Sequence, residues 1–363
     1  MAYLEFHNVR IAGIAAGVPK NIADNLHPSE DDAISSEYSP EDFVSITGVK
    51  ERRVSFELTT SDLCFAAAER LISDLQWDKD EIGALFFVSQ TPDYILPATA
   101  CILQDRLKLS KECYAMDISL GCSGWVYGLS SAVSLLSAGS IKKALVMCGE
   151  AKSRAKGPRR RLNPLFGSAG TVTAVEYAEG ASSMFFHFGT NGEGFDAIIT
   201  PEGGGRVPFT QDSFATEIVD GKEIYRFQSR MKGMDVFSFG ITTAPKSVKG
   251  LAEHYGFDYL QSDWFVFHQA NMKMNNLIAK KLKLPSEKVP SSMYRFGNTN
   301  GASIPMTIVA ELKGKCEDKP TSFVCCGFGV GLSWGTVFFK TEQLVISDLV
   351  EVSDDETDKV HVI

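Results

Sequence analysis

Asp117-Ile-Ser-Leu-Gly-Cys-Ser-Gly-Trp-Val-Tyr-Gly-Leu129 is the most informative stretch of this chain, because it places one cysteine between two kinds of local structure. A run that ends in Gly121 precedes Cys122, and the residues after it have apolar positions that recur with helical spacing. We therefore expect a helix from Trp125 to Ala138, with the Cys122 thiol at its N-terminus. Free backbone N–H groups and the positive end of the helix dipole favour the thiolate there, which is the nucleophilic form of cysteine.

Two distant stretches offer residues that could work with such a nucleophile. His268 follows the apolar run Trp264-Phe-Val-Phe267, and Asn298 lies in the turn-like sequence Gly297-Asn-Thr-Asn-Gly301. A cysteine, an imidazole and a carboxamide supply a nucleophile and two hydrogen-bond donors. Each residue alone has an ordinary structural interpretation: a packed thiol, a structural histidine or a turn asparagine. They share a site only if the fold brings distant strand ends together.

The bulk composition narrows the class of protein. At 363 residues the chain is long enough for two domains or one large duplicated unit, and 44% hydrophobic with 22% charged residues is an ordinary globular balance. The first residues lack the basic segment of a secretory signal, and no apolar run is long enough to span a bilayer. We therefore expect a cytoplasmic enzyme with no membrane partner. The net charge of −9 disfavours nucleic acid as a partner.

The eight cysteines form neither Cys-x-x-Cys pairs nor clusters with histidine at metal-ligand spacing, so we expect reduced thiols and no metal site.

Short apolar runs alternate with amphipathic stretches along the whole chain, which predicts an α/β protein. The expected strands are Ile82–Val88, Leu145–Cys148, Val172–Val175, Trp264–Phe267, Phe323–Cys326 and Gly335–Phe339. The expected helices, besides the one after Cys122, are Ser61–Leu75, Ala98–Leu107, Met231–Tyr255 and Met272–Leu282.

The motifs together resemble those of β-ketoacyl-acyl carrier protein synthase III, a member of the thiolase superfamily. The resemblance runs from about Val9 to Phe339 and rests on these motifs: Asp117–Leu129, His268-Gln-Ala-Asn271, Gly297-Asn-Thr299, Ala302-Ser-Ile-Pro305 and Gly327-Phe-Gly-Val-Gly-Leu-Ser-Trp-Gly335. It implies a thiolase-like, duplicated five-layer α-β-α-β-α fold, with halves at 1–180 and 181–342. Residues 343–363 extend beyond the point where this family normally stops. Their start alternates like an edge strand, and we expect their acidic end to be a mobile tail.

The resemblance also implies roles for site residues. Cys122 would take an acyl group from a thioester, and His268 and Asn298 would stabilise the enolate that forms when a malonyl unit loses carbon dioxide. The backbone N–H groups of Cys122 and Val330 would hold the carbonyl oxygen of the acyl group. Family members carry glycine where Val330 stands, and a β-branched residue is more restricted in its backbone angles. No cofactor is implied beyond the phosphopantetheine arm of coenzyme A or acyl carrier protein.

Further positions concern the carrier of the acyl group and the partner subunit. Lys273, Lys280 and Lys281 match the family's docking residues for acyl carrier protein, although a solvated helix face is the ordinary interpretation of such a pattern. Phe43, Ile46 and Arg160 match coenzyme A contacts; Phe43 replaces a larger tryptophan and Ile46 an arginine, which favours a carrier-bound or otherwise atypical acyl donor. Leu96 matches a phenylalanine that reaches into the acyl pocket of the partner in a homodimer. Ser168 and Ser238 replace a family aspartate and lysine.

Three functions remain open at this point. The first is a decarboxylating Claisen condensation in a specialised fatty acid or polyketide-type pathway. The second is an acyltransferase that forms an ester or amide, with His268 as the general base. The third is a catalytically degraded subunit of a heterodimer. The presence of all three catalytic residue types, Asn298 included, favours the first.

Overall fold

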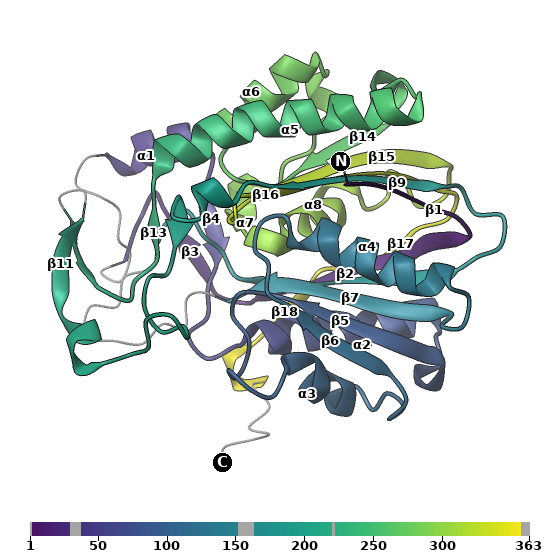
Figure 1. Ribbon diagram of the computed structural model, residues 1–363, viewed down its shortest axis with the longest axis horizontal. Coiled ribbons are helices and arrows are strands. Elements are labelled where there is room, and N and C mark those ends of the chain that lie inside the picture. The colour runs from purple at the N-terminus through teal and green to yellow at the C-terminus, as the bar shows by residue number, and fades with distance from the viewer. Residues whose placement is uncertain (1, 30–37, 152–162, 220–221, 357–363) are drawn as a thin grey trace.

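Five alternating layers of helices and sheets make up the structure, a computed structural model that describes residues 2–29, 38–151, 163–219 and 222–356 (Figure 1). One layer of helices covers the top of the upper sheet in Figure 1, another lies between the sheets, and the remaining layer lies below the lower sheet. The expected thiolase-like α-β-α-β-α fold is confirmed.

The lower sheet has seven strands, in the order β17-β2-β8-β7-β5-β6, with β18 also paired to β2. Its central strands are rich in Val, Ile, Ala and Phe and are buried along their length, as expected for strands covered on both faces. The strand bounds are β2 Val9–Pro19, β5 Ile82–Val88, β6 Tyr114–Ile118, β7 Lys143–Glu150, β8 Ala169–Tyr177, β17 Val345–Ile346 and β18 Val350–Val352.

The upper sheet has five strands, in the order β1-β9-β16-β15-β14. The pair β14 and β15 is parallel, and the other pairs are antiparallel. The bounds are β1 Ala2–Phe6, β9 Met184–Thr190, β14 Trp264–Phe267, β15 Thr321–Gly329 and β16 Ser333–Thr341. The C-terminal ends of β14 and β15 therefore lie at the same edge of this sheet.

The three largest parts of the apolar core are separated by the sheets. Between the sheets lie α4 (Gly124–Ser137) and α8 (Ser303–Leu312), whose apolar residues form one continuous cluster with the inner faces of both sheets. Outside the lower sheet pack α2 (Thr60–Leu75) and α3 (Thr99–Arg106), and outside the upper sheet pack α5 (Gly233–Tyr255) and α6 (Met272–Leu282). There are also two short helices, α1 (Pro40–Thr47), which has no buried residue, and α7 (Met293–Phe296), whose Met293 and Phe296 are buried.

Small hairpins and bridges complete the secondary structure, at the bounds β3 Ile22–Asp24 with β4 Glu51–Arg53, β10 Ile198–Ile199 with β13 Arg230–Met231, and β11 Thr216–Val219 with β12 Lys222–Tyr225. All predicted strands are confirmed, and the predicted helices agree to within two residues at each end. One boundary is wrong: Met231 belongs to β13 and not to the following helix, because it pairs with Ile198.

The two ends of the chain each join the sheet formed mainly by the other half. Strand β1 pairs with β9 in the upper sheet, while β17 and β18 add parallel strands beside β2 in the lower sheet. The expected edge-strand character of the extension after residue 342 is thus confirmed. The expectation of a mobile tail falls largely on residues 357–363, outside the described residues, and the division of the chain at residue 180 stays a prediction.

Among the described residues, no helix is both long enough and apolar enough to cross a bilayer.

Candidate active site

Cys122 lies between the end of β6 and the start of α4, as the sequence predicts, and its side chain is partly accessible. Glycines of β15 press against it. A Cβ atom added to Gly329 would lie 2.6 Å from the Cβ and 2.7 Å from the Sγ of Cys122, and one added to Gly327 would lie 2.9 Å from the carbonyl oxygen of Cys122. All three distances are shorter than nonbonded atoms tolerate, so only glycine fits at these two positions without a shift of the nucleophile loop.

Gly121, immediately before the nucleophile, is equally enclosed. A Cβ at this position would lie 2.5 Å from the Oε1 of Gln90 and 2.8 Å from the Cγ1 of Val330. Gly301, in the 3-10 turn η7 (Asn300–Ala302), approaches Gly121 from another side: its added Cβ would lie 2.9 Å from the Gly121 carbonyl oxygen. The loop that carries Cys122 is therefore held between the ends of β5, β15 and the turn after Asn298.

His268 follows β14 directly and is 2% exposed. Its backbone N–H donates to the carbonyl oxygen of Cys326 on β15, and its ring packs edge-on against Phe328 with the ring centroids 5.6 Å apart. The Nδ1 atom lies 2.7 Å from the hydroxyl of Ser303, the first residue of α8. Because Ser303 engages Nδ1, the predicted role toward a substrate falls to Nε2.

Asn298 is 5% exposed, and both the oxygen and the nitrogen of its side-chain amide form hydrogen bonds with the backbone. The Oδ1 atom accepts a hydrogen bond of 2.9 Å from the backbone N–H of Asn300, and Nδ2 donates over 3.4 Å to the carbonyl oxygen of Ala270. Ala270 stands two residues after His268. An amide nitrogen carries two N–H groups, so the group that does not point at Ala270 can serve as a donor to a ligand.

One strand connects the three predicted catalytic residues. Within four residues of β15, Cys326 holds the backbone of His268, Phe328 contacts its ring and Gly329 contacts the Cys122 thiol. Asn298 is linked to the same region by its hydrogen bond to Ala270, and the turn that follows Asn298 packs on Gly121. Residues that are remote in sequence are thus brought to one region, at the edge of the upper sheet where β14 and β15 end. Their catalytic roles stay predictions.

Val330 occupies the position predicted to supply an oxyanion donor. The carbonyl oxygen of Val330 accepts a hydrogen bond from Ser333, whose hydroxyl lies 2.7 Å from that of Ser123, the residue after the nucleophile. The unusual backbone angle of this turn falls on Gly331, with a φ of +140°, and not on Val330. A β-branched residue is therefore accommodated here, because the neighbouring glycine carries the conformation that it could not adopt.

The remaining cysteines, apart from the exposed Cys101, are partly or fully buried. All eight cysteines are free thiols, and burial raises the pKa of six of them, to about 11 for Cys113 and Cys316 and to about 12 for Cys326. The same cause raises the pKa values of Cys64, Cys148 and Cys325. Among the described residues, no cluster of three or more His, Cys, Asp or Glu side chains could hold a metal ion.

The predicted docking lysines lie together on α6. Lys273, Lys280 and Lys281 are exposed, and Lys273 and Lys280 border a surface groove of about 440 Å³ between α1 and α6. Ile46 of α1, which is 46% exposed, lines the same groove, whereas Phe43 is partly buried and is not among its lining residues. The structure therefore brings Ile46 to the lysines.

Other predicted positions are scattered. Leu96 is 80% exposed in the loop before α3, and Ser238 is exposed on α5. Ser168 is buried, and its backbone N–H donates to the carbonyl oxygen of Arg53. Arg160 lies outside the described residues.

Sequence reasoning assigned no role to four residues that contact the candidate site: Ser303, Phe328, Gly329 and Gln90. The first three lie within the motifs on which the resemblance rests, so the sequence marked their positions although it assigned them no role. Gln90 follows the predicted strand Ile82–Val88 by two residues, and only the packing of β5 beside Gly121 reveals it.

Comparison with known proteins identifies the family of this chain. Residues 116–192 match the family model described as 3-oxoacyl-[acyl-carrier-protein] synthase III, and residues 253–341 match the model of its C-terminal part. Beta-ketoacyl-[acyl-carrier-protein] synthase III of Bacillus pumilus is 31% identical over 337 residues, which cover 91% of this chain and 98% of the relative.

Solved structures agree as well. The 3-oxoacyl-(acyl-carrier protein) synthase of Burkholderia xenovorans LB400 superposes with a TM-score of 0.87 at 37% identity, covering 97% of this chain and 99% of that one. The priming β-ketosynthase of the R1128 polyketide pathway, at 19% identity and a TM-score of 0.80, shares the fold. With its motifs, its five layers and these relatives in agreement, the chain belongs to the 3-oxoacyl-[acyl-carrier-protein] synthase III family.

Proposed function

We propose that this transferase catalyses a decarboxylating Claisen condensation between an acyl group on Cys122 and a malonyl group on acyl carrier protein. The observation that carries the proposal is the contact of one strand, β15, with both His268 and Cys122, and the attachment of Asn298 to the backbone beside His268. This arrangement supports a nucleophile that works together with two neighbouring hydrogen-bond donors.

The first half-reaction loads the enzyme. The Cys122 thiolate attacks the carbonyl carbon of an acyl thioester, the carrier thiol leaves and takes up the proton, and an acyl-cysteine remains. The N-terminus of α4 favours the thiolate, and the backbone N–H groups of Cys122 and Val330 are our candidates for holding the oxyanion.

The second half-reaction forms the carbon–carbon bond. The malonyl thioester loses carbon dioxide, and the electron pair moves onto its carbonyl oxygen, where Nε2 of His268 and Nδ2 of Asn298 donate hydrogen bonds. The resulting enolate attacks the acyl-cysteine carbonyl, which releases Cys122 as thiolate and leaves a 3-oxoacyl thioester on the carrier. For Nε2 to be the donor, Nδ1 must accept, so the Ser303 hydroxyl donates to it.

Acyl carrier protein is the proposed partner and acyl thioesters are the proposed substrates, with no cofactor beyond the phosphopantetheine arm. Replacement of a family arginine by Ile46, in the groove beside Lys273 and Lys280, supports a donor that is bound to the carrier protein in preference to coenzyme A. Val330 and Ser168 also differ from the family pattern, which supports a role in a specialised fatty acid or polyketide-type pathway. The 80% exposure of Leu96 supports a homodimer in which a second copy covers it.

Intact-mass measurement tests the first half-reaction. Incubation with acyl carrier protein thioesters is expected to add one acyl mass to the wild type and none to Cys122→Ala. Release of labelled carbon dioxide from malonyl carrier protein then separates condensation from ester or amide formation, because only condensation needs decarboxylation. Acylation without carbon dioxide release would contradict the proposed reaction, and absence of acylation from every donor would favour a degraded subunit.

A further inference from the structure

The segment 343–356, which we call the extension, ends beside residues that hold Asn298 in place. After β18 the carbonyl oxygen of Val352 accepts a hydrogen bond of 2.9 Å from the backbone N–H of Lys20. The Asp354 carboxylate then accepts from Asn21, over 3.1 Å, and from the hydroxyl of Ser55, over 2.6 Å. The extension is therefore fastened both to the end of β2 and to the residues that follow β4.

Arg53, the last residue of β4, is the cation that the extension contacts. The Glu351 carboxylate lies 2.7 Å from Nη1 of Arg53, and among the described residues it is the carboxylate that pairs with this guanidinium. The Arg53 side chain is only 13% exposed, and Nη1 also donates over 3.2 Å to the carbonyl oxygens of Pro19 and Lys20. Such a network gives a long side chain one defined position.

The backbone of Arg53 is connected to the backbone of Asn298 by a short series of hydrogen bonds. The carbonyl oxygen of Arg53 accepts from the N–H of Ser168 over 2.9 Å. The preceding residue, Gly167, donates its N–H to the carbonyl oxygen of Asn298 over 3.2 Å. The N–H of Asn298 in turn donates over 2.9 Å to the carbonyl oxygen of Leu165. A shift of β4 would therefore be passed to both backbone groups of Asn298.

The side chain of Arg53 gives a second connection to the same residue. Its guanidinium carbon lies 5.9 Å from the ring centroid of Phe296, within the range of a cation–π contact, and Phe296 is 2% exposed. Gly297, between Phe296 and Asn298, has a φ of +63°, and a Cβ added to it would lie 2.8 Å from the carbonyl oxygen of Leu165. The chain before Asn298 thus has little freedom to adjust.

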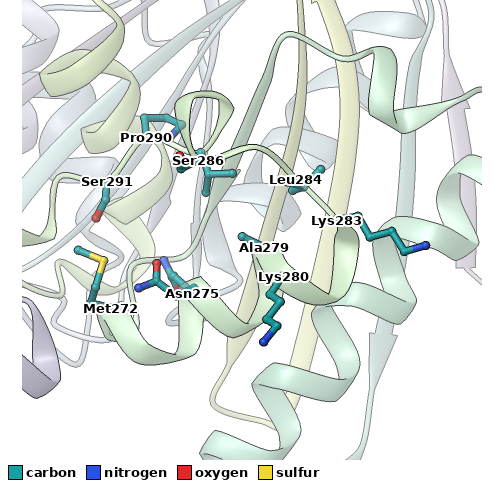
Figure 2. A pocket seen from close by; sticks show the side chains of 11 residues that line it. Met272, Asn275, Ala279, Lys280, Lys283, Leu284, Ser286, Pro290 and Ser291 are labelled. Carbon is teal, nitrogen blue, oxygen red and sulfur yellow. The ribbon is translucent and has the colours of Figure 1, made fainter.

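The beginning of this segment is held from the side of His268. Ser291 donates a hydrogen bond of 2.7 Å to Oε1 of Gln269, the residue after His268. Ser291 also lines a surface groove of about 420 Å³ beside α6, where Figure 2 shows it near Met272. The segment from Ser291 to Asn298 is therefore fixed at one end beside His268 and at the other end by Arg53.

We propose that the extension positions Asn298 for decarboxylation, with Arg53 as the positioning residue between them. The inference rests on the proposed function, in which the Asn298 amide donates to the malonyl carbonyl oxygen. Loading of Cys122 does not use that amide. Loss of the Glu351–Arg53 contact should therefore slow the second half-reaction and leave the first one nearly intact.

Two substitutions break the contact from its two sides. Arg53→Met removes the guanidinium but keeps an apolar stem, and Glu351→Lys places a second cation against Arg53. The matched control is Asp348→Lys, which makes the same change of charge in the same extension. Asp348 pairs with Arg70 and Lys313, which make none of the contacts to Asn298 described above.

The first measurement does not depend on activity. Hydrogen–deuterium exchange followed by mass spectrometry reports on peptides that contain Gly167 and Asn298, whose N–H groups form the connecting hydrogen bonds. Exchange in these peptides is expected to be about threefold faster or more in Arg53→Met and Glu351→Lys, and unchanged in Asp348→Lys.

The second measurement compares the two half-reactions. Release of carbon dioxide from malonyl carrier protein is expected to fall by about tenfold in Arg53→Met and about threefold in Glu351→Lys. Acylation of Cys122 by an N-acetylcysteamine thioester should stay within about twofold of wild type in all three variants, because the Asn298 amide has no part in it.

Wild-type exchange at Asn298 in both contact variants would overturn the proposal, and so would an equal loss of acylation and decarboxylation. If Arg53→Met fails to fold by circular dichroism, Glu351→Lys decides. A wild-type enzyme that releases no carbon dioxide from malonyl carrier protein would contradict the proposed function and, with it, the catalytic purpose of this contact. The exchange rates would then still show whether the extension holds Asn298.

Discussion

Individual glycines set the position of the Cys122 thiol. The nucleophile is a short side chain on a loop, and β15, η7 and the side chains of Gln90 and Val330 press closely on that loop. A Cβ added to Gly329 would meet Cys122 itself, so relieving the clash would move the nucleophile. Small changes in these glycines are therefore expected to act on chemistry more strongly than on binding.

Gly329→Ala is the sharpest test of this packing. The new Cβ would lie 2.6 Å from the Cβ of Cys122, so β15 or the nucleophile loop has to move. A displacement of this kind is expected to slow acylation of Cys122 by about 100-fold. Rapid-quench mass analysis of acyl-enzyme formation measures the rate, and Gly139→Ala is the control because a Cβ at Gly139 meets no atom within 4 Å. Because Gly139 has a positive φ, the control should lose some stability but keep its acylation rate.

Ser303 tests the proposed tautomer of His268. Removing the hydroxyl in Ser303→Ala leaves Nδ1 without its donor and lets the ring take the other tautomer, so decarboxylation of malonyl carrier protein should fall by roughly tenfold. The pH–rate profile should shift as well, which a purely structural role would not cause.

Ser292→Ala is the matched control for Ser303→Ala. Ser292 is also a buried serine whose hydroxyl has a hydroxyl partner, Thr307. Equal loss of decarboxylation in both variants would contradict a specific role for Ser303.

The predictability of the site differs from residue to residue. Cys122 could be found from local sequence, because the start of a helix has a local signature. His268 and Asn298 could be assigned roles only from the resemblance, since a histidine after a strand and an asparagine in a turn are common structural features. The roles of Ser303, Phe328 and Gly329 depend on how α8 and β15 pack against β14, and no local pattern reports that packing.

At the level of elements, the extension after residue 342 is part of the lower sheet. Leu344, Ile346 and Val352 are at most 3% exposed, and Asp354 accepts hydrogen bonds from Asn21 and Ser55. The alternation of apolar and polar residues predicted a strand here. Its parallel pairing with β2 could not be predicted, because that choice depends on which strand edge the rest of the fold leaves open.

Ile346→Ala is expected to lower the free energy of unfolding by about 2–5 kcal/mol, because it leaves a cavity at a buried site in the extension. Urea denaturation measures the change. Glu351→Ala removes an exposed partner of Arg53 in the same segment and should cost less than about 1 kcal/mol. Similar values for the two variants would show that the extension is not packed as described.

At the level of the whole molecule, a stack of three aromatic rings connects strand β1 to strand β9 and helix α5. Tyr3 of β1 lies between His187 of β9, at 4.5 Å, and His254 of α5, at 3.9 Å. His187 Nδ1 also lies 2.9 Å from the hydroxyl of Ser247 on α5. Burial is the main cause that lowers the pKa of His187, and the neighbouring His254 acts in the same direction.

This arrangement makes stability depend on pH. The folded protein holds His187 neutral below the ordinary pKa of histidine, about 6.5, whereas the unfolded chain takes up a proton there. The contribution of this group is therefore complete above pH 6.5 and decreases as the pH falls below it. Urea denaturation at pH 7.5 and 5.5 should show a smaller loss of stability for His187→Gln than for the wild type. An equal loss of stability in both proteins would show that groups other than His187 cause the pH dependence.

The exchange of terminal strands between the sheets has a consequence for how the protein is made. Residues 2–6 are synthesised well before their neighbours in β9, which follow only after some 180 more residues, and the sheet closes when β16 has been made. Strand β2 likewise waits for β17 and β18 before its free edge is covered. Neither half, expressed by itself, would contain all the strands of its own sheet, so assembly is expected to be completed only after β18 has been synthesised.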